Sequence, residues 1–163
     1  MFKIDIHTHI LPENLNDVTG KFTDSRFLKI DHVDETSAML KKDGKSFRKV
    51  DCNCWNHQTR INDCDDTKVN MQVLSTLPVL FSYWAQDDEC LALSQFLNNH
   101  IAHICREEPQ RFIGLGTIPM QNTDMAISEM ERCVNELKFP GIEIGSNING
   151  ENLSIEKIQP IFE

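Results

Sequence analysis

The sequence predicts an α/β fold built from parallel βα units, and two observations support this prediction. Four strand-like segments alternate with helical patterns along the 163 residues, which is the order typical of βαβ units. Apolar residues make up 40% of the chain and charged residues 25%, a composition that is typical of globular proteins and argues against a disordered chain.

The four strand-like segments are recognised by apolar runs or alternation and by the prolines that follow two of them. The first segment alternates polar and apolar residues. The second ends before Pro78, and the third stops near Pro119. The expected strands lie at 2–6, 71–77, 111–117 and 141–145.

Helical patterns separate these strands, and each carries its apolar residues on one face at helical spacing. Either Asp87 or Asp88 is expected to cap the second helix. Thr123 is expected to cap the third, which the pair Pro140-Gly141 terminates. The expected helices cover 57–68, 88–106 and 123–138, and a last one starts near Ser154.

About fifty residues separate the first strand from the first helix, which is too long for an ordinary βα loop. Three segments within this stretch look extended, and Asp43-Gly44 between the last two is a strong hairpin signal. We therefore expect a small antiparallel insert at 27–50, laid over the end of the first strand. Its strands are expected at 27–33, 38–42 and 45–50.

His7 and His9 follow the first strand and are candidate metal ligands. Residues two apart in a strand point to the same face, so the two imidazoles and Asp5 are expected on one face and Ile4 and Ile6 on the other. An imidazole pair at the C-terminal end of a strand can grip one metal ion, and the active sites of βα barrels lie at that edge. The alternative is a pair of histidines that is exposed or satisfied by hydrogen bonds.

Other histidines and cysteines form weaker metal-binding patterns. One group of four could hold a structural zinc, but its spacing lacks the paired C-x-x-C knuckles of such sites. That group is Cys52, Cys54, His57 and Cys64. His100 and His103 lie three apart on a helix, and we expect them at the surface.

Charge and hydropathy exclude several functions. No apolar run approaches the roughly 18 residues that a membrane-spanning helix needs. The formal net charge of -9 makes the chain a poor ligand for nucleic acid or for an anionic membrane. The N-terminus shows no export signal, so we expect a cytoplasmic protein whose six cysteines are free thiols.

The chain contains, in order, the blocks KIDIHTHILPE, MLKKDGKSFR, NCW, STLPVLFSYWA, RFIGLGTIPMQ, EMERCVNELKFPG and IEIG. With these blocks the whole chain resembles the metal-dependent amidohydrolase superfamily, in its branch of nonhydrolytic decarboxylases. Within that branch it resembles the aminocarboxymuconate-semialdehyde decarboxylase family. Several blocks matching in order make this resemblance more specific than the two histidines alone.

The resemblance implies a zinc-bearing TIM (β/α)8 barrel that decarboxylates 2-amino-3-carboxymuconate 6-semialdehyde in tryptophan catabolism by the kynurenine route. His7 and His9 match the first two zinc ligands of the family. Its third ligand histidine, its ligand aspartate and its acid/base histidine have no counterpart, so no catalytic residue is expected in this chain. A full barrel needs about 250 residues. We therefore expect residues 1–163 to form the N-terminal half of one barrel domain, about four βα units, with the insert after the first strand.

The resemblance also assigns substrate-binding residues to the insert. Arg48 matches the family's own-subunit arginine for the substrate carboxylate, and Lys42 matches a position near the pocket. Guanidinium grips carboxylate in bidentate fashion, which suits a small dicarboxylate substrate. Five of the 16 basic residues lie within 41–50, where they would attract an anion, although most of these lysines suit a solvated edge strand equally well. The aromatic residues Phe81, Tyr83 and Trp84 either line the pocket or pack under the loop.

Three functions remain open on these observations. The chain is half of a decarboxylase that is inactive alone, because two imidazoles are fewer than the three protein ligands of a catalytic zinc. The full-length enzyme is then expected to be a homodimer. Alternatively, the chain is a noncatalytic product that associates with a full-length subunit through its open sheet edges. A hydrolase of the same superfamily is the third possibility, but Arg48 and the insert fit a dicarboxylate better than an amide or lactone.

Overall fold

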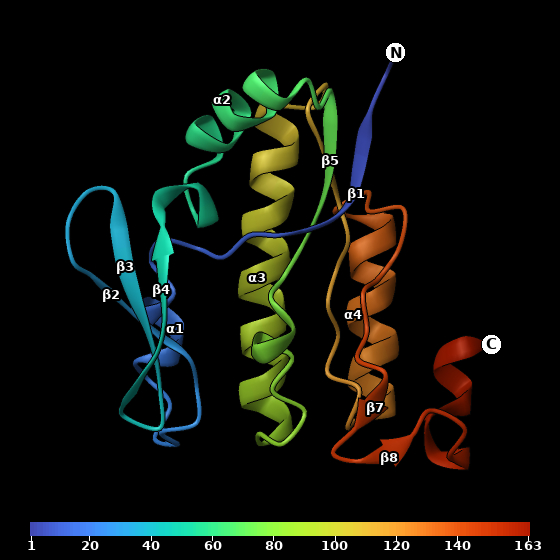
Figure 1. The fold of residues 1–163 in the computed structure, drawn as a ribbon. Coiled ribbons are helices and arrows are strands. Elements are labelled where there is room, and N and C mark those ends of the chain that lie inside the picture. Colours follow the sequence, from blue (N-terminus) through green and yellow to red (C-terminus); the bar gives the residue numbers. More distant parts are fainter.

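The computed structural model describes all 163 residues and contains a parallel sheet covered by helices (Figure 1). Strands β1 (Ile4–His9), β5 (Met71–Ser75) and β6 (Phe112–Gly114) pair in that order, and both pairings are parallel. A single parallel bridge between Gly116 and Ile142 extends the sheet by a fourth position. The predicted α/β fold of parallel βα units is confirmed.

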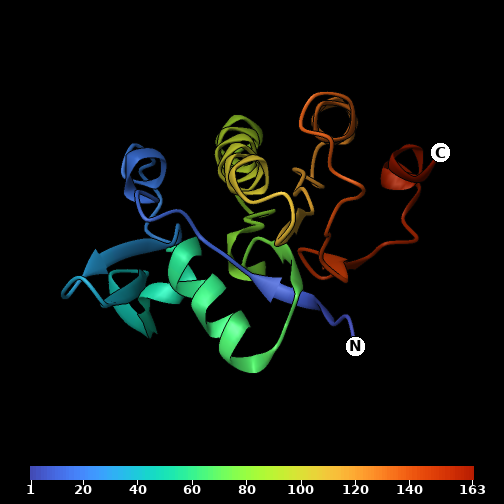
Figure 2. The same ribbon diagram turned by 90° about the horizontal axis from the view of Figure 1, so that it is seen from above.

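The helices α2 (His57–Thr67), α3 (Asp87–Glu107) and α4 (Thr123–Asn135) connect these strands. Viewed from above, α3, α4 and the C-terminal 3₁₀ helix Glu156–Phe162 lie in an arc outside the strands (Figure 2). Buried apolar residues fill the space between the sheet and this arc, as in half of a βα barrel. They include Ile10, Leu74, Ile101, Phe112 and Phe139.

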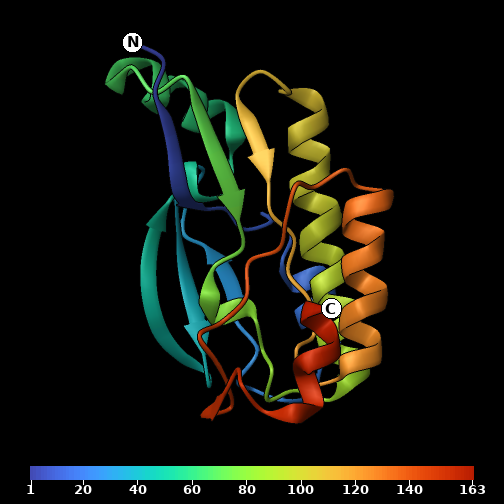
Figure 3. The same ribbon diagram turned by 90° about the vertical axis from the view of Figure 1, so that its right-hand side faces the viewer.

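The antiparallel insert is present as predicted. Strands β2 (Lys29–His32), β3 (Ser37–Lys42) and β4 (Lys45–Asp51) form a sheet of their own beside the parallel strands and away from α4 (Figure 3). Asp43 and Gly44 both have positive φ angles, 54° and 68°, which a two-residue type I′ hairpin turn requires. Before the insert lies the short helix α1 (Asn16–Thr19), which the sequence did not predict.

Several element ends differ from expectation. The cap of α4 is Asn122, whose side chain accepts a hydrogen bond from the Met125 backbone N–H at 3.1 Å, whereas the Thr123 hydroxyl donates to the Lys157 carbonyl. No side chain caps α3: Asp87 and Asp88 lie inside its first turn, where the helix dipole favours acids. The Thr123 and Asp87/Asp88 caps were therefore wrong predictions.

The C-terminal part departs most from the prediction. The expected fourth strand at 141–145 is reduced to the single bridge at Ile142. The short hairpin β7 (Asn147–Ile148) and β8 (Glu151–Asn152) follows it and was not predicted. Its turn residues Asn149 and Gly150 have φ angles of 52° and 89°, so the Asn-Gly dipeptide was the overlooked signal. None of the helices combines the length and the apolar character that crossing a membrane requires.

Candidate metal and carboxylate-binding site

Two of the candidate site residues, His7 and His9, lie at the C-terminal edge of the parallel strands, together with two segments that follow neighbouring strands. His7 and His9 end β1, the segment 76–84 follows β5, and Gly145 follows the bridge residue Ile142. Because parallel strands point the same way, their carboxyl ends meet at one edge of the sheet, where α/β proteins bind their ligands.

His7 and His9 lie side by side. Their ring centroids are 5.0 Å apart, with the ring planes at 80° to each other. A β-bulge lies between Asp5 and Thr8 and so includes the position of His7: Asp5 pairs with Gln72 but Thr8 pairs with Leu74, so that one extra residue is inserted in β1. His7 is exposed to solvent, and His9 is half-buried.

Asp5 does not share the site, and the prediction that it lies on the same face as the two histidines was wrong. Its carboxylate accepts hydrogen bonds from the His7 backbone N–H at 3.3 Å and from Gln72 Nε2 at 3.4 Å. It lines a cleft with Arg60 and Asp63 of α2. The bulge explains the error, because one inserted residue shifts the alternation of side chains between the two faces.

Two contacts hold His9 in place, and a third anchors the arginine that makes one of them. Its Nδ1 lies 3.0 Å from Ser75 Oγ of β5, and Arg60 Nη2 of α2 donates to its carbonyl oxygen at 2.7 Å. Arg60 also donates from Nε to the Asn53 carbonyl at 3.0 Å, so it ties the end of β1 to the segment after β4. Burial lowers the pKa of Arg60. Neither Ser75 nor Arg60 was singled out from the sequence, because nothing in a lone serine or arginine shows a contact made across the fold.

The two imidazoles fit two positions of a metal site. Nowhere in the chain do three or more His, Cys, Asp or Glu side chains gather in a way that could hold a metal ion. The structural-zinc alternative at Cys52, Cys54, His57 and Cys64 is therefore wrong. A catalytic zinc needs about three protein ligands, so the two imidazoles do not by themselves form such a site.

Lys42 lies in a cleft of about 420 Å³ between the end of β5 and the C-terminal hairpin. The rest of the lining comes from the segments 78–84 and 145–149. Phe81 and Tyr83 stack there with ring centroids 5.5 Å apart, and the Tyr83 hydroxyl accepts a hydrogen bond from the Gly145 backbone N–H at 3.0 Å. Burial raises the pKa of Tyr83 to about 12, so the hydroxyl stays protonated. The aromatic residues both line this cleft and pack in the core.

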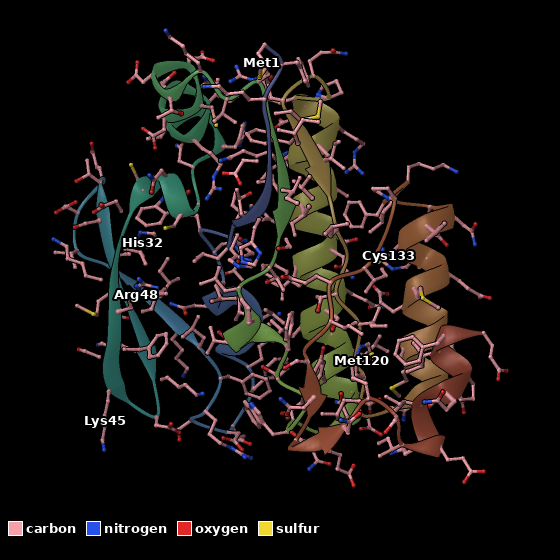
Figure 4. All side chains as sticks on the ribbon, turned by 45° about the vertical axis from the view of Figure 1, so that its right-hand side comes forward. Met1, His32, Lys45, Arg48, Met120 and Cys133 are labelled. Atoms are coloured by element: carbon pink, nitrogen blue, oxygen red, sulfur yellow. The ribbon has the colours of Figure 1, made fainter.

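Arg48 lies exposed on β4 (Figure 4). It pairs with Leu40 in the register of β3 and β4. Directly opposite residues of an antiparallel pair share a face, so Arg48 lies on the same face of the sheet as the buried Leu40 and Val50. The cleft around Lys42 includes neither Arg48 nor the two histidines.

A second group of histidines lies between α2 and α3. His57 and His103 each approach Glu107, at 3.5 Å and 3.4 Å, and they share a cleft with His100. His103 is exposed, as expected, but His100 is half-buried with no hydrogen-bond partner for Nε2, so its expected surface position was wrong. Burial lowers the pKa of His100 to about 4.

Comparison with known families shows to which family the chain belongs. The amidohydrolase family model matches residues 4–163, nearly the whole chain. The chain belongs to the amidohydrolase family. Its fold of parallel βα units, with two histidines after the first strand, agrees with that membership.

Two curated relatives are similar over almost the whole chain. The 2-amino-3-carboxymuconate-6-semialdehyde decarboxylase of Dictyostelium discoideum is 48% identical over 99% of this chain, and that of Caenorhabditis elegans is 34% identical over 99%. In both cases the match covers 45% of the relative, so the chain spans about half the length of the curated relatives it matches.

Among solved structures, the chain is similar to 5-carboxyvanillate decarboxylase from Novosphingobium aromaticivorans, complexed with manganese and 4-hydroxy-3-methoxy-5-nitrobenzoic acid. The TM-score is 0.75 at 23% identity, covering 99% of this chain and 46% of that one. At this identity the likeness concerns the fold alone, and it confirms the predicted half of a TIM barrel.

Proposed function

We propose that this chain carries the N-terminal half of a zinc-dependent, nonhydrolytic decarboxylase that acts on 2-amino-3-carboxymuconate 6-semialdehyde. The observation that carries the proposal is the imidazole pair, with centroids 5.0 Å apart, at the C-terminal end of the first parallel strand. Support for the reaction comes from relatives at 48% and 34% identity that are named for it.

The chain's own residues divide into metal ligands and substrate-binding groups. His7 and His9 would hold the divalent ion, and imidazole nitrogen suits zinc. When bound, such an ion supplies a Lewis acid that stabilises negative charge developing on the substrate. Arg48 binds one substrate carboxylate through two parallel hydrogen bonds, and Lys42 adds a positive charge beside the stacked Phe81 and Tyr83 rings.

The chain by itself is expected to be inactive, because it supplies two imidazoles where a catalytic zinc has about three protein ligands. The test is an absorbance assay of decarboxylation on the purified 163-residue protein with added zinc, beside a full-length relative. We expect substrate consumption only with the relative. Turnover by the chain at the relative's rate would overturn the inactivity, and a relative that leaves this substrate untouched would overturn the reaction.

A second candidate function is association with a full-length subunit. It is favoured by the open side of β1, an edge strand whose Ile4 and Ile6 are 48% and 75% exposed. Exposed apolar side chains and the free edge of a strand promote association. Co-expression of the tagged chain with an untagged full-length relative tests it: we expect the two to co-purify, and a monodisperse monomer that captures nothing would contradict it. The homodimer and the cytoplasmic location expected of the full-length enzyme are part of the same proposal.

A further inference from the structure

Ser75 faces the ring of His9 across the pairing of β1 and β5, where the two residues are partners in the parallel register. We propose that Ser75 is a positioning residue that holds His9 in the tautomer with the proton on Nδ1, which leaves the Nε2 lone pair free for a metal ion. The inference rests on the proposed function insofar as His9 is taken as a metal ligand.

The geometry around the Ser75 hydroxyl is closed on two sides. Its oxygen lies 3.0 Å from His9 Nδ1 and 3.2 Å from the Thr8 carbonyl oxygen. The side chain is buried, with 5% of the residue exposed, so water has little access to either contact. A buried hydroxyl of this kind is expected to satisfy its hydrogen bonds within the protein.

Counting protons then decides the tautomer. A serine hydroxyl has one proton to donate and lone pairs to accept with. The Thr8 carbonyl can only accept, so both contacts are hydrogen bonds only when Ser75 donates to Thr8 and accepts from His9. His9 must then carry its proton on Nδ1. In the opposite arrangement Ser75 donates to Nδ1, the ring proton sits on Nε2, and that nitrogen cannot bind a metal.

The backbone around His9 is fixed independently of its ring. Arg60 donates to the His9 carbonyl at 2.7 Å, and the Ile10 backbone N–H donates to the Ser75 carbonyl at 2.9 Å. The ring itself has only the hydroxyl of Ser75 as a hydrogen-bond partner. The neighbouring ring of His7 has no hydrogen bond to the protein, so it serves as an internal comparison within the same pair.

The first test reads the tautomer directly on the metal-free chain. Long-range proton–nitrogen correlation NMR at about pH 8, above the ordinary imidazole pKa of about 6.5, distinguishes a protonated from an unprotonated ring nitrogen. We expect His9 to show a protonated Nδ1 and an unprotonated Nε2, while His7 shows a mixture. A protonated Nε2 on His9 overturns the proposal, whether or not the chain binds metal, so this result stands apart from the fate of the proposed function.

The second test uses variants. Ser75→Ala is expected to turn the His9 signals into a tautomer mixture and to weaken Zn²⁺ binding by about 10- to 100-fold, the usual effect of removing a partner of a metal-ligating histidine. Zinc affinity is measured by competition with a chromogenic chelator. Ser75→Thr keeps the hydroxyl and is expected to restore both readouts.

The matched control is Thr76→Val, which removes the hydroxyl of the next residue, buried but without a hydrogen-bond partner. It is expected to leave the tautomer and the zinc affinity unchanged. Circular dichroism checks that each variant is folded. If Ser75→Ala unfolds the chain, Ser75→Thr and the wild-type spectrum still decide the proposal. Equal zinc losses in Ser75→Ala and Thr76→Val would overturn it, because the effect would then come from general loosening of β5.

Discussion

The α3–α4 side of the parallel sheet and its β1 side differ in how deeply their side chains are buried. Between α3 and α4 the fully buried Asn98 accepts from the Thr117 backbone N–H at 2.8 Å and donates to the Thr117 carbonyl at 2.8 Å and to Glu129 Oε1 at 2.6 Å. Glu129, itself buried, is paired with Arg132 at 2.7 Å.

The β1 side is open by comparison. Ile4 and Ile6 are exposed, and the His7 ring makes no hydrogen bond. The α3–α4 side therefore holds a buried hydrogen-bond network, while the β1 side exposes apolar side chains and an imidazole to solvent. His7 and His9 thus lie on the exposed β1 side, next to the well-buried core under α3 and α4. The following predictions test this difference in burial.

The largest effect is expected from Asn98→Ala. The substitution leaves the Thr117 backbone groups without partners and removes a hydrogen bond from the buried Glu129, which we expect to lower the free energy of unfolding by about 3 kcal/mol or more. Urea denaturation measures the change. As a control, Asn99→Ala removes an exposed partner of Arg132 and should stay within about 0.5 kcal/mol. Similar losses in both variants would show that the α3–α4 side is not specially dependent on its buried network.

His100 lies on α3, facing the cleft that it shares with His57 of α2 and His103 of its own helix, and the Leu11 backbone is also close to it. Its pKa is lowered to about 4 by burial, whereas an unfolded histidine has a pKa of about 6.5. Between these values the unfolded chain binds a proton that the folded chain does not. Stability is therefore expected to fall as the pH drops from about 6.5 towards 4, by about 2–3 kcal/mol in all, and to be unaffected by this group at higher pH.

The check on His100 is the slope of unfolding free energy against pH. His100→Gln should flatten the slope in this window, while His103→Gln, at an exposed position, should leave most of it. Carboxylates contribute their own slope at the acidic end, so the comparison is made between the two variants at each pH. An unchanged slope in His100→Gln would mean that water reaches the His100 ring in the folded chain, so that burial does not lower its pKa.

How much the sequence could predict follows the same division. Periodicity located the helices α3 and α4, because local spacing determines which face of a helix is apolar. The Asp43-Gly44 dipeptide likewise located the hairpin turn, because both residues adopt the positive φ angles that the turn needs. The H-x-H spacing likewise brought out His7 and His9. Three features could not be predicted, since each depends on residues that are distant in sequence: the β-bulge between Asp5 and Thr8, the Ser75 contact and the Asn98 network. Lys42 and Arg48 came from family resemblance, and their roles stay predictions.

A smaller effect is expected on association through the open β1 side. Ile6 is 75% exposed there, and burying such a side chain in an interface contributes about 1.5–3 kcal/mol. Ile6→Ser should therefore weaken association, with itself or with a full-length subunit, by about 10- to 100-fold. Analytical ultracentrifugation over a concentration series measures this. Phe47→Ser on β4, which removes an apolar side chain 53% exposed on the other sheet, is the matched control. If Phe47→Ser dissociates the assembly and Ile6→Ser does not, the open surface lies on the insert instead.

The smallest effect tests whether the polar contacts between α3 and α4 extend to the N-terminus of α4. Asn122 accepts from the Met125 backbone N–H at 3.1 Å and donates to Asp87 of α3 at 2.7 Å, so one side chain both caps a helix and joins it to its neighbour. Asn122→Ala is expected to lower the unfolding free energy by about 1 kcal/mol, the usual effect of losing an N-cap.

Asn122→Asp should keep the cap yet place a second carboxylate beside Asp87, so it should recover only part of the lost stability. At high salt it should recover more, because salt screens the repulsion between the two carboxylates. Thr123→Ala removes a hydroxyl that bonds the Lys157 carbonyl at an exposed position and should stay within about 0.5 kcal/mol. Urea denaturation measures both losses. If Thr123→Ala were the more destabilising, Thr123 would be the N-cap of α4, and apolar packing alone would hold α3 and α4 together.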